Sequence, residues 1–133
     1  MDPEVRVRIQ SSADVVTARQ QGRILAARLG FSNSNLTVIA TAISEITRNI
    51  VEYAKEGEVR ISLVENGARR GVRVVATDTR PGIPDISVGM RVGYSTGQGL
   101  GIGLPGSRRL MDEFEIESTV GQGTTVTMTK WAV

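Results

Sequence analysis

The strongest pattern in the sequence is a helical stripe of apolar residues within SNSNLTVIATAISEITRNIVEYAKEG, residues 32–57. The apolar positions of this stripe are spaced three, four, three and four residues apart, at Leu36, Ile39, Ile43, Ile46 and Ile50. That spacing places all of them on one face of an α-helix. Because a face this apolar has to be buried, the rest of the chain must supply a surface that covers it.

Segments of alternating apolar and polar residues predict that surface. One segment precedes the helix in the sequence and four follow it: EVRVRI (4–9), EVRISLVE (58–65), GVRVVATD (71–78), EFEIEST (113–119) and TTVTMTKW (124–131). A period of two is typical of strands that are buried on one side. The turn signals NGARRG and VGQG separate the last four segments into two pairs, so we expect two β-hairpins.

Two further helices and one long loop complete the predicted elements. The segment SSADVVTARQQGRILAARLG (11–30) predicts a helix of about 17 residues, with serine and aspartate at its start and Gly30 as its C′ residue. The segment LPGSRRLMDEF (104–114) predicts a helix whose first turn holds Pro105. Residues 79–103 have little periodicity, and a loop of this length is usually functional.

The order of the elements predicts the fold class. It reads β-α-α-β-β-loop-α-β-β, which favours an α/β (α+β) two-layer sandwich: helices on one face of a mixed, mostly antiparallel sheet. A chain of 133 residues is long enough for one hydrophobic core, so we expect a single domain over residues 1–133.

Composition excludes several kinds of chemistry. The sequence contains neither cysteine nor histidine. Catalytic triads built on histidine and the usual zinc sites are therefore excluded, and a bound metal would be a hard ion such as Mg²⁺ held by oxygen. A general base would have to be Asp, Glu, Lys or Tyr. The absence of cysteine is compatible with a cytoplasmic protein.

Charge and hydropathy argue against nucleic acid and membrane as partners. The net charge of the chain is only +2, and the basic residues are scattered along the sequence. The chain has one Trp, two Tyr and two Phe, which offers little surface for base stacking. It also has no apolar run of membrane-spanning length and no signal-peptide pattern at its start.

The stretch GQGLGIGLPG, residues 97–106, contains five glycines and a literal G-x-G-x-x-G. A dinucleotide-binding loop of the Rossmann type requires a strand immediately before this motif, and VGYSTGQG is not one. The alternating glycines Gly97, Gly99, Gly101 and Gly103 lead instead into a predicted helix start, where backbone N–H groups can hold phosphate. A disordered surface loop is the less favoured alternative for the segment taken alone.

Three polar residues are candidates for a site. Glu45 and Asn49 lie four residues apart on one face of the second helix, at the edge of its apolar stripe. The carboxylate suits a general base and the amide oxygen suits Mg²⁺, although for the pair taken alone a solvated helix shoulder is the favoured explanation. Asp78 ends a predicted strand, where it either lines a pocket or simply begins a turn.

Four motifs in order resemble the ATP-binding superfamily of gyrase, histidine kinases and mismatch-repair proteins, known as the GHKL or Bergerat fold. The first two are the N box, matched by E-x-x-R-N at Glu45–Asn49, and the first glycine box, matched by DTRPGI at Asp78–Ile83. The others are the second and third glycine boxes, matched by TGQGLGIGL at Thr96–Leu104 and GQGTT at Gly121–Thr125. The segments TAISEITRNIVEYA, PGIPDI and GLPGSRRLMDEFEIES and the terminal KW resemble more closely the RsbT-type serine/threonine kinases of the bacterial stressosome, which are related to anti-sigma-factor kinases.

This resemblance implies a function and a set of residue roles. ATP with Mg²⁺ would be the cofactor, a STAS-domain protein the substrate, and a PP2C-type phosphatase a downstream effector. Glu45 would be the general base, Asn49 would hold Mg²⁺, and Asp78 would accept from the adenine amino group with support from Thr125 through a water. The remaining nucleotide-binding positions would be Gly82, Thr96, Gly97, Gly99, Leu100, Gly101, Gly103 and Leu104. A solvated helix face is favoured over phosphate contact for Arg108 and Arg109.

One position departs from the superfamily pattern. Arg80 stands where the first glycine box has its first glycine, while Gly82 is retained. The substitution keeps open a second function, that of a degenerate nucleotide-binding module that switches partners without transferring phosphate. Simple ATP hydrolysis is the third and weakest alternative. The sequence is also compatible with a homodimer.

Overall fold

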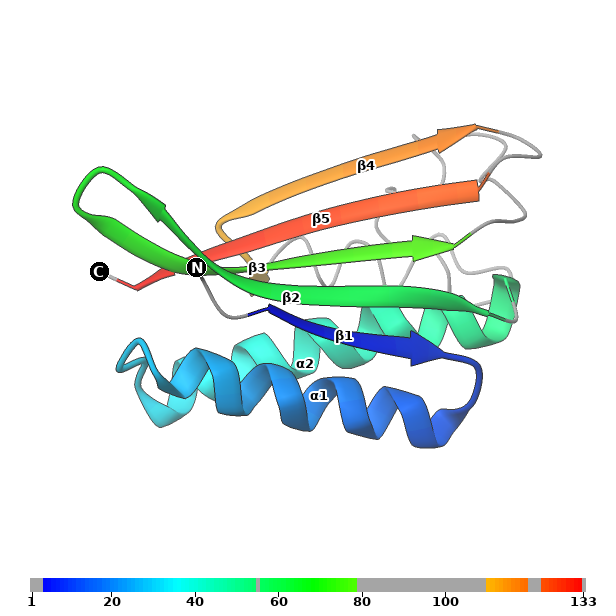
Figure 1. Cartoon of the computed structure of the whole chain (residues 1–133), viewed down its shortest axis with the longest axis horizontal. Coiled ribbons are helices and arrows are strands. Elements are labelled where there is room, and N and C mark those ends of the chain that lie inside the picture. Colours follow the sequence, from blue (N-terminus) through cyan, green and yellow to red (C-terminus); the bar gives the residue numbers. More distant parts are fainter. Residues whose placement is uncertain (1–3, 55, 79–109, 120–122, 133) are drawn as a thin grey trace.

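A computed structural model describes residues 4–54, 56–78, 110–119 and 123–132. It has two layers, a five-stranded sheet and a pair of helices that cover one of its faces (Figure 1). The strands are β1 (Glu4–Ile9), β2 (Gly57–Asn66), β3 (Arg69–Asp78), β4 (Glu113–Thr119) and β5 (Gly123–Ala132). The helices are α1 (Ser12–Ala27) and α2 (Asn33–Asn49), and a π-helical turn, η1 (Ile50–Ala54), follows α2 directly. The predicted two-layer architecture is confirmed.

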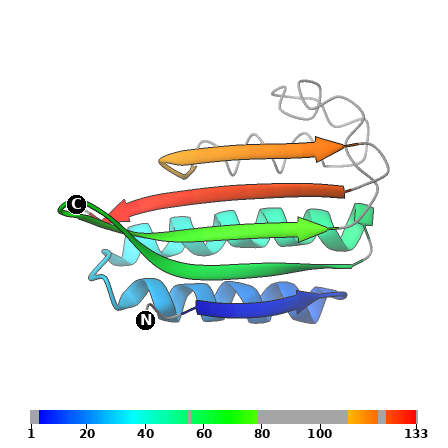
Figure 2. The ribbon, with the colours of Figure 1, turned by 45° about the horizontal axis from the view of Figure 1, so that its top comes forward.

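The sheet has the strand order β1-β2-β3-β5-β4, and every one of these neighbouring pairs is antiparallel. The second helix lies behind the central strands, and the first lies beside it behind β1 (Figure 2). The β2–β3 hairpin turns at Gly67, whose φ of +63° is a conformation that glycine adopts without strain. This turn lies where the Asn-Gly signal predicted it.

Both helices begin with side-chain caps, and the aspartate at the start of α1 is one that the sequence predicted. The Asp14 carboxylate accepts hydrogen bonds from the backbone N–H groups of Gln10 and Ser11, at 2.9 and 3.1 Å. The Ser32 hydroxyl accepts from the N–H of Asn35 at 3.1 Å. These bonds satisfy donors that have no partner within the helix. At the other end of α1, Arg28 is the C-cap. Gly30, with φ +77°, is therefore the second residue after the cap and not the first, as was predicted.

The apolar stripe of α2 forms the centre of the core. Leu36, Ile39, Ile43, Ile46 and Ile50 are all buried, as their spacing predicts. They pack against the inward-facing residues of the sheet, which include Val59, Ile61, Val72, Val74, Val126 and Met128. Gly22 lets α1 approach closely, because a Cβ at this position would collide with the Cδ1 atom of Ile43 and lie 3.2 Å from that of Ile61.

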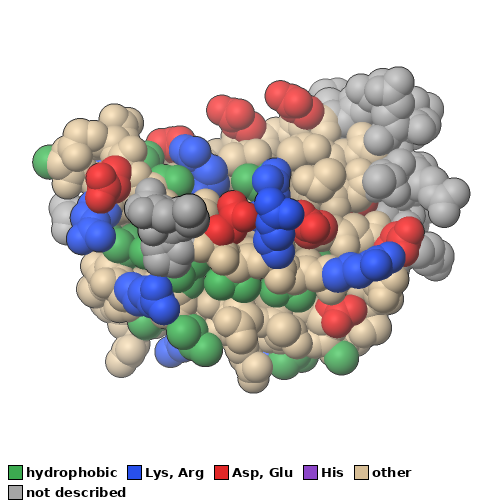
Figure 3. Space-filling model, viewed as in Figure 1, with side chains coloured by type: hydrophobic (Ala, Val, Ile, Leu, Met, Phe, Trp, Pro, Cys, Tyr) green, Lys and Arg blue, Asp and Glu red, His purple; other side chains and the backbone are tan. Residues whose placement is uncertain are grey.

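The other face of the sheet is polar. Its strands present threonines and charged residues, and Figure 3 shows acidic and basic side chains interspersed over the strands. Arg73 of β3 donates from Nε to the Thr129 hydroxyl of β5 at 3.2 Å. An antiparallel sheet with one buried and one polar face explains the alternating sequence pattern.

Two features differ from the sequence-based prediction. The helix expected over residues 104–114 ends at Leu110 in the described part, because Met111 and Asp112 form a bend and β4 begins at Glu113. Pairing with β5 outweighs helix formation at Glu113 and Phe114, which lie opposite Thr129 and Met128. The continuous helix expected beyond Asn49 changes to the π-helical turn η1. The loop predicted over residues 79–103 lies outside the described residues.

We predict that Ile43→Ala lowers the free energy of unfolding by about 2–5 kcal/mol, because it removes a fully buried side chain and leaves a cavity. The matched control is Ile24→Ala on α1, where the side chain is 59% exposed and the change should stay within about 0.5 kcal/mol. Urea unfolding followed by circular dichroism measures both. Equal losses for the two variants would contradict the position of the core.

Candidate functional site

The candidate site lies where α2 ends beside the carboxyl end of β3. In both ribbon views the C-terminal turns of α2 and η1 lie next to the end of β3 and the start of β2 (Figures 1 and 2). The β-ladder places Gly57 directly opposite Asp78, and the nearest side chain to Gly57 is that of Ile50. Asn49 immediately precedes Ile50. The fold therefore brings the end of the helix and Asp78, far apart in sequence, to one end of the molecule.

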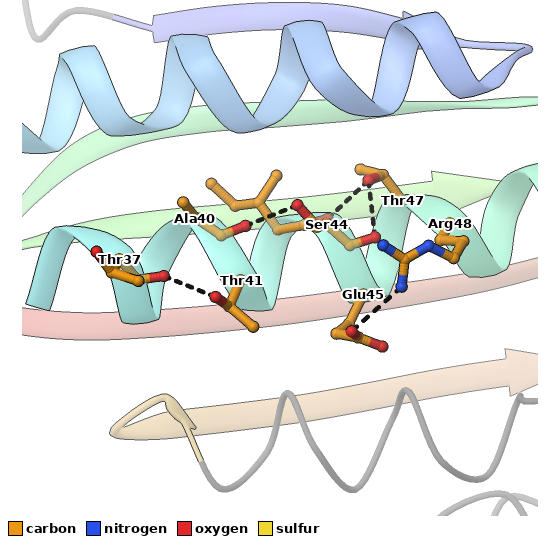
Figure 4. Close-up of polar contacts among 8 residues, drawn as sticks. Thr37, Ala40, Thr41, Ser44, Glu45, Thr47 and Arg48 are labelled. Carbon is orange, nitrogen blue, oxygen red and sulfur yellow. Dashed lines mark hydrogen bonds and ion pairs between the residues drawn. The ribbon is translucent and has the colours of Figure 1, made fainter. Parts of the chain in front are cut away.

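Glu45 occupies the outer shoulder of α2. Its carboxylate pairs with the guanidinium of Arg48 on the same helix, with 3.2 Å between Oε1 and Nη1 (Figure 4). The Glu45 side chain is 31% exposed and that of Arg48 50% exposed. An ion pair this accessible contributes at most about 1 kcal/mol, so another hydrogen-bonding group can displace Arg48 from the carboxylate.

The hydroxyl groups of α2 near Glu45 are paired within the helix. Ser44 and Thr47 are buried, and their hydroxyls donate to the carbonyls of Ala40 and Ile43 at 3.0 and 2.7 Å (Figure 4). These bonds let polar side chains lie on the core side of the helix without loss of hydrogen bonding. The other polar side chains of this turn are those of Glu45, Arg48 and Asn49.

The amide of Asn49 has an unpaired polar atom. Its Nδ2 atom is buried and has no hydrogen-bond partner among the residues that the structure describes. Buried polar atoms are nearly always paired, and one without a partner calls for an explanation such as a bound ligand or ion. The amide group carries both a donor and an acceptor, and its oxygen is a ligand that Mg²⁺ accepts. The unpaired nitrogen is a donor, so it fits an acceptor such as a phosphate oxygen at the end of α2.

No group of three or more Asp and Glu side chains within the described residues could hold a metal ion by itself. Mg²⁺ usually takes one or two protein ligands together with phosphate oxygens and waters. The amide oxygen of Asn49 could supply one such protein ligand.

Asp78 is the last residue of β3 and lies half-buried at the edge of the core. Its Oδ1 atom accepts a hydrogen bond of 3.3 Å from the backbone N–H of Thr124 on β5. The carboxylate is thus fixed by the neighbouring strand at the end of the helix-covered face. A carboxylate held in this way can accept from a ligand amino group.

The structure places Thr124, and not Thr125, beside Asp78. Thr124 lies directly opposite Asp78 in the ladder, whereas Thr125 pairs with Thr77 and points to the other face of the sheet. The Thr125 side chain therefore lies on the face of the sheet opposite Asp78, and its support of Asp78 through a water stays a prediction. The sequence contained the signal, because Val126 and Met128 point inward and the alternation puts Thr124 on their side.

Most of the predicted glycine-rich positions fall outside the described residues. These are Gly82, Thr96, Gly97, Gly99, Leu100, Gly101, Gly103 and Leu104, together with Arg80, Arg108 and Arg109. Their roles remain predictions. Of the predicted site residues that the structure describes, it brings Glu45, Asn49 and Asp78 to one end of the fold.

No helix in the described part of the chain is both long and apolar enough to cross a membrane.

Comparisons with known proteins agree with this arrangement. The sequence model of the histidine kinase-like ATPase domain matches residues 10–130. The serine/threonine-protein kinase RsbT of Bacillus subtilis is 47% identical over 131 residues, which cover 98% of each chain. An anti-sigma F factor of a Thermoanaerobacter species is 32% identical over 86% of this chain and 82% of its own. The anti-sigma F factor of Geobacillus stearothermophilus is 33% identical over 78% and 75% of the two chains.

The matched region contains both α2 and the β3–β5 pair, so it includes every described residue of the candidate site. The chain belongs to the histidine kinase-like ATPase family, within which it is an RsbT-like serine/threonine kinase homologue.

Proposed function

We propose that this chain transfers the γ-phosphate of ATP to a serine or threonine hydroxyl of a STAS-domain protein. The observation that carries the proposal is the buried Nδ2 atom of Asn49, which has no partner among the described residues and lies four residues after Glu45 on the helix that ends beside Asp78. The similarity to a serine/threonine-protein kinase over 98% of the chain supports transfer to protein rather than simple hydrolysis. The motif resemblance supports a STAS-domain substrate, a PP2C-type phosphatase as effector, and a cytoplasmic location.

Each described residue has a chemical task in this proposal. Asp78, held by the N–H of Thr124, accepts a hydrogen bond from the adenine amino group and orients the base. Asn49 holds Mg²⁺ through its amide oxygen. When bound, Mg²⁺ neutralises charge on the phosphates, which is the main requirement of phosphoryl transfer.

Glu45 acts on the acceptor protein. The substrate hydroxyl displaces Arg48 from the carboxylate, and Glu45 takes the hydroxyl proton as the new oxygen–phosphorus bond forms. The bond between the γ-phosphorus and its bridging oxygen breaks, and ADP is the leaving group. The helix α2 holds Glu45 and Asn49 on one face. Holding these two groups in place lowers the activation barrier, because they need not be ordered during the reaction.

We predict that Glu45→Gln slows phosphate transfer by about 10²- to 10⁴-fold and leaves the Kd for ATP within about threefold, because it removes only the proton acceptor. Glu115→Gln on the exposed outer face of the sheet is the matched control and should transfer at the wild-type rate. Transfer from labelled ATP to the cognate STAS-domain protein measures the first effect, and calorimetry the second.

Normal transfer by Glu45→Gln would remove Glu45 as the base. A wild-type chain that binds ATP but phosphorylates no STAS-domain protein would favour the partner-switching module that Arg80 suggests.

A second prediction concerns the adenine end of the site. Asp78→Asn should weaken ATP binding by about 10- to 150-fold, because the new amide nitrogen faces the adenine amino group, while its oxygen can still accept from Thr124.

Thr124→Val should weaken binding about fivefold, through loss of a hydroxyl next to Asp78. Thr125→Val is the matched control on the opposite face, with an expected change below about twofold. If Thr125→Val has the larger effect in calorimetry, the assignment of the two threonines is reversed.

A further inference from the structure

Gly57 occupies a contact point between the two halves of the candidate site. It is the first residue of β2 and pairs with Asp78 across the ladder. The side chain of Ile50, which begins η1 directly after Asn49, packs over it from the helix layer. Gly57 therefore touches both the strand end that carries Asp78 and the helix end that carries Asn49.

The space at Gly57 admits no side chain. A Cβ atom placed there would lie 2.5 Å from the backbone oxygen of Thr77, 2.9 Å from the Cγ2 atom of Ile50 and 3.3 Å from the Cα atom of Asp78. Two of these three atoms belong to the backbone of β3, which cannot rotate out of the way. Ile50 is 4% exposed, so its side chain has no empty space to move into.

Any residue larger than glycine at position 57 would therefore push the end of β3 and the end of α2 apart. Gly57 does not have the positive φ that strains other residues, so the requirement is for space alone. We propose that Gly57 is a positioning residue of the nucleotide site, where the missing side chain sets the spacing between Asn49 and Asp78. The inference rests on the proposed roles of these two residues in ATP binding.

Gly71 offers a matched comparison at the opposite end of the same sheet. A Cβ atom there would lie 2.7 Å from the backbone oxygen of Lys130 and 2.7 Å from the Cε3 atom of Trp131. Gly71 lies on β3, seven residues before Asp78, and faces neither α2 nor the candidate site. A substitution at Gly71 thus reproduces the steric conflict without touching the nucleotide.

The test compares Gly57→Ala with Gly71→Ala in the full chain, with ATP and Mg²⁺ as the probe and sucrose present to support folding. Both variants should unfold at lower urea concentration than the wild type. Gly57→Ala should raise the Kd for ATP about tenfold or more, because a displacement of about 1 Å within a site is sufficient for such a loss. Gly71→Ala should leave the Kd within about twofold.

A rescue variant separates positioning from general instability. Ile50→Leu keeps the side-chain volume but removes the Cγ2 methyl that the new Cβ would meet. The double variant Gly57→Ala with Ile50→Leu should bind ATP more tightly than Gly57→Ala. If Gly57→Ala does not fold, the double variant is compared with Ile50→Leu alone, and a Kd about threefold or more higher supports the proposal.

Wild-type affinity in Gly57→Ala, or equal losses in Gly57→Ala and Gly71→Ala, would overturn the role of Gly57. Failure of the wild-type chain to bind ATP would instead overturn the nucleotide site itself.

Discussion

The packing of α2 against the sheet is the interaction on which the rest of the structure depends. Ile39, Ile43 and Ile46 are almost completely buried between the strands and α1, and together they fix the helix in position and rotation. Rotation matters because the opposite edge of the same helix carries Glu45 and Asn49. The close approach at Gly22 brings α1 onto this helix, so the apolar stripe is enclosed from both sides. The core thereby sets the direction in which the site residues project.

The site itself is built where regular structure ends. Asp78 is the last residue of β3, Asn49 is the last α-helical residue of α2, and η1 follows at once. Short π-helical turns often occur at functional sites, and here the turn carries the chain from Asn49 to the start of β2. The unpaired amide of Asn49 and the steric limit at Gly57 both lie at this junction. A buried nitrogen without a partner among the described residues and a close backbone contact both cost stability, and a ligand site at this junction would account for both.

Periodicity predicted most of the fold. The stripe of α2 and the five alternating segments were sufficient to predict the central helix, the hairpins and the arrangement in two layers. The reason is that burial on one face imposes a period on each element. The residues at which helices begin and end were predicted less accurately. The helix predicted through Phe114 ends earlier, since pairing with β5 depends on residues distant in sequence. The π-helical turn and the crowding at Gly57 also depend on tertiary contacts and have no local signature.

The residue roles in the candidate site stay predictions. Glu45, Asn49 and Asp78 were chosen from helical spacing, strand position and motif resemblance, and the fold brings them to one end of the molecule. Thr125 was chosen from the motif alone, although the alternation of β5 already favoured Thr124. A motif gives residue types and order, whereas only the strand register decides which of two adjacent threonines faces the ligand.

The central claim, that the end of α2 beside Asp78 binds a Mg²⁺–nucleotide, is tested most directly by the side-chain amide signals of Asn49 in a ¹⁵N-labelled chain. Asn49→Asp identifies these signals by their loss. Titration with ATP and Mg²⁺ should shift them in a saturable manner, and chelation of Mg²⁺ should largely reverse the shift, while the exposed Asn66 amide at the far hairpin stays unchanged. Saturable ATP binding that leaves the Asn49 amide unchanged, or no binding at millimolar ATP, would contradict the account.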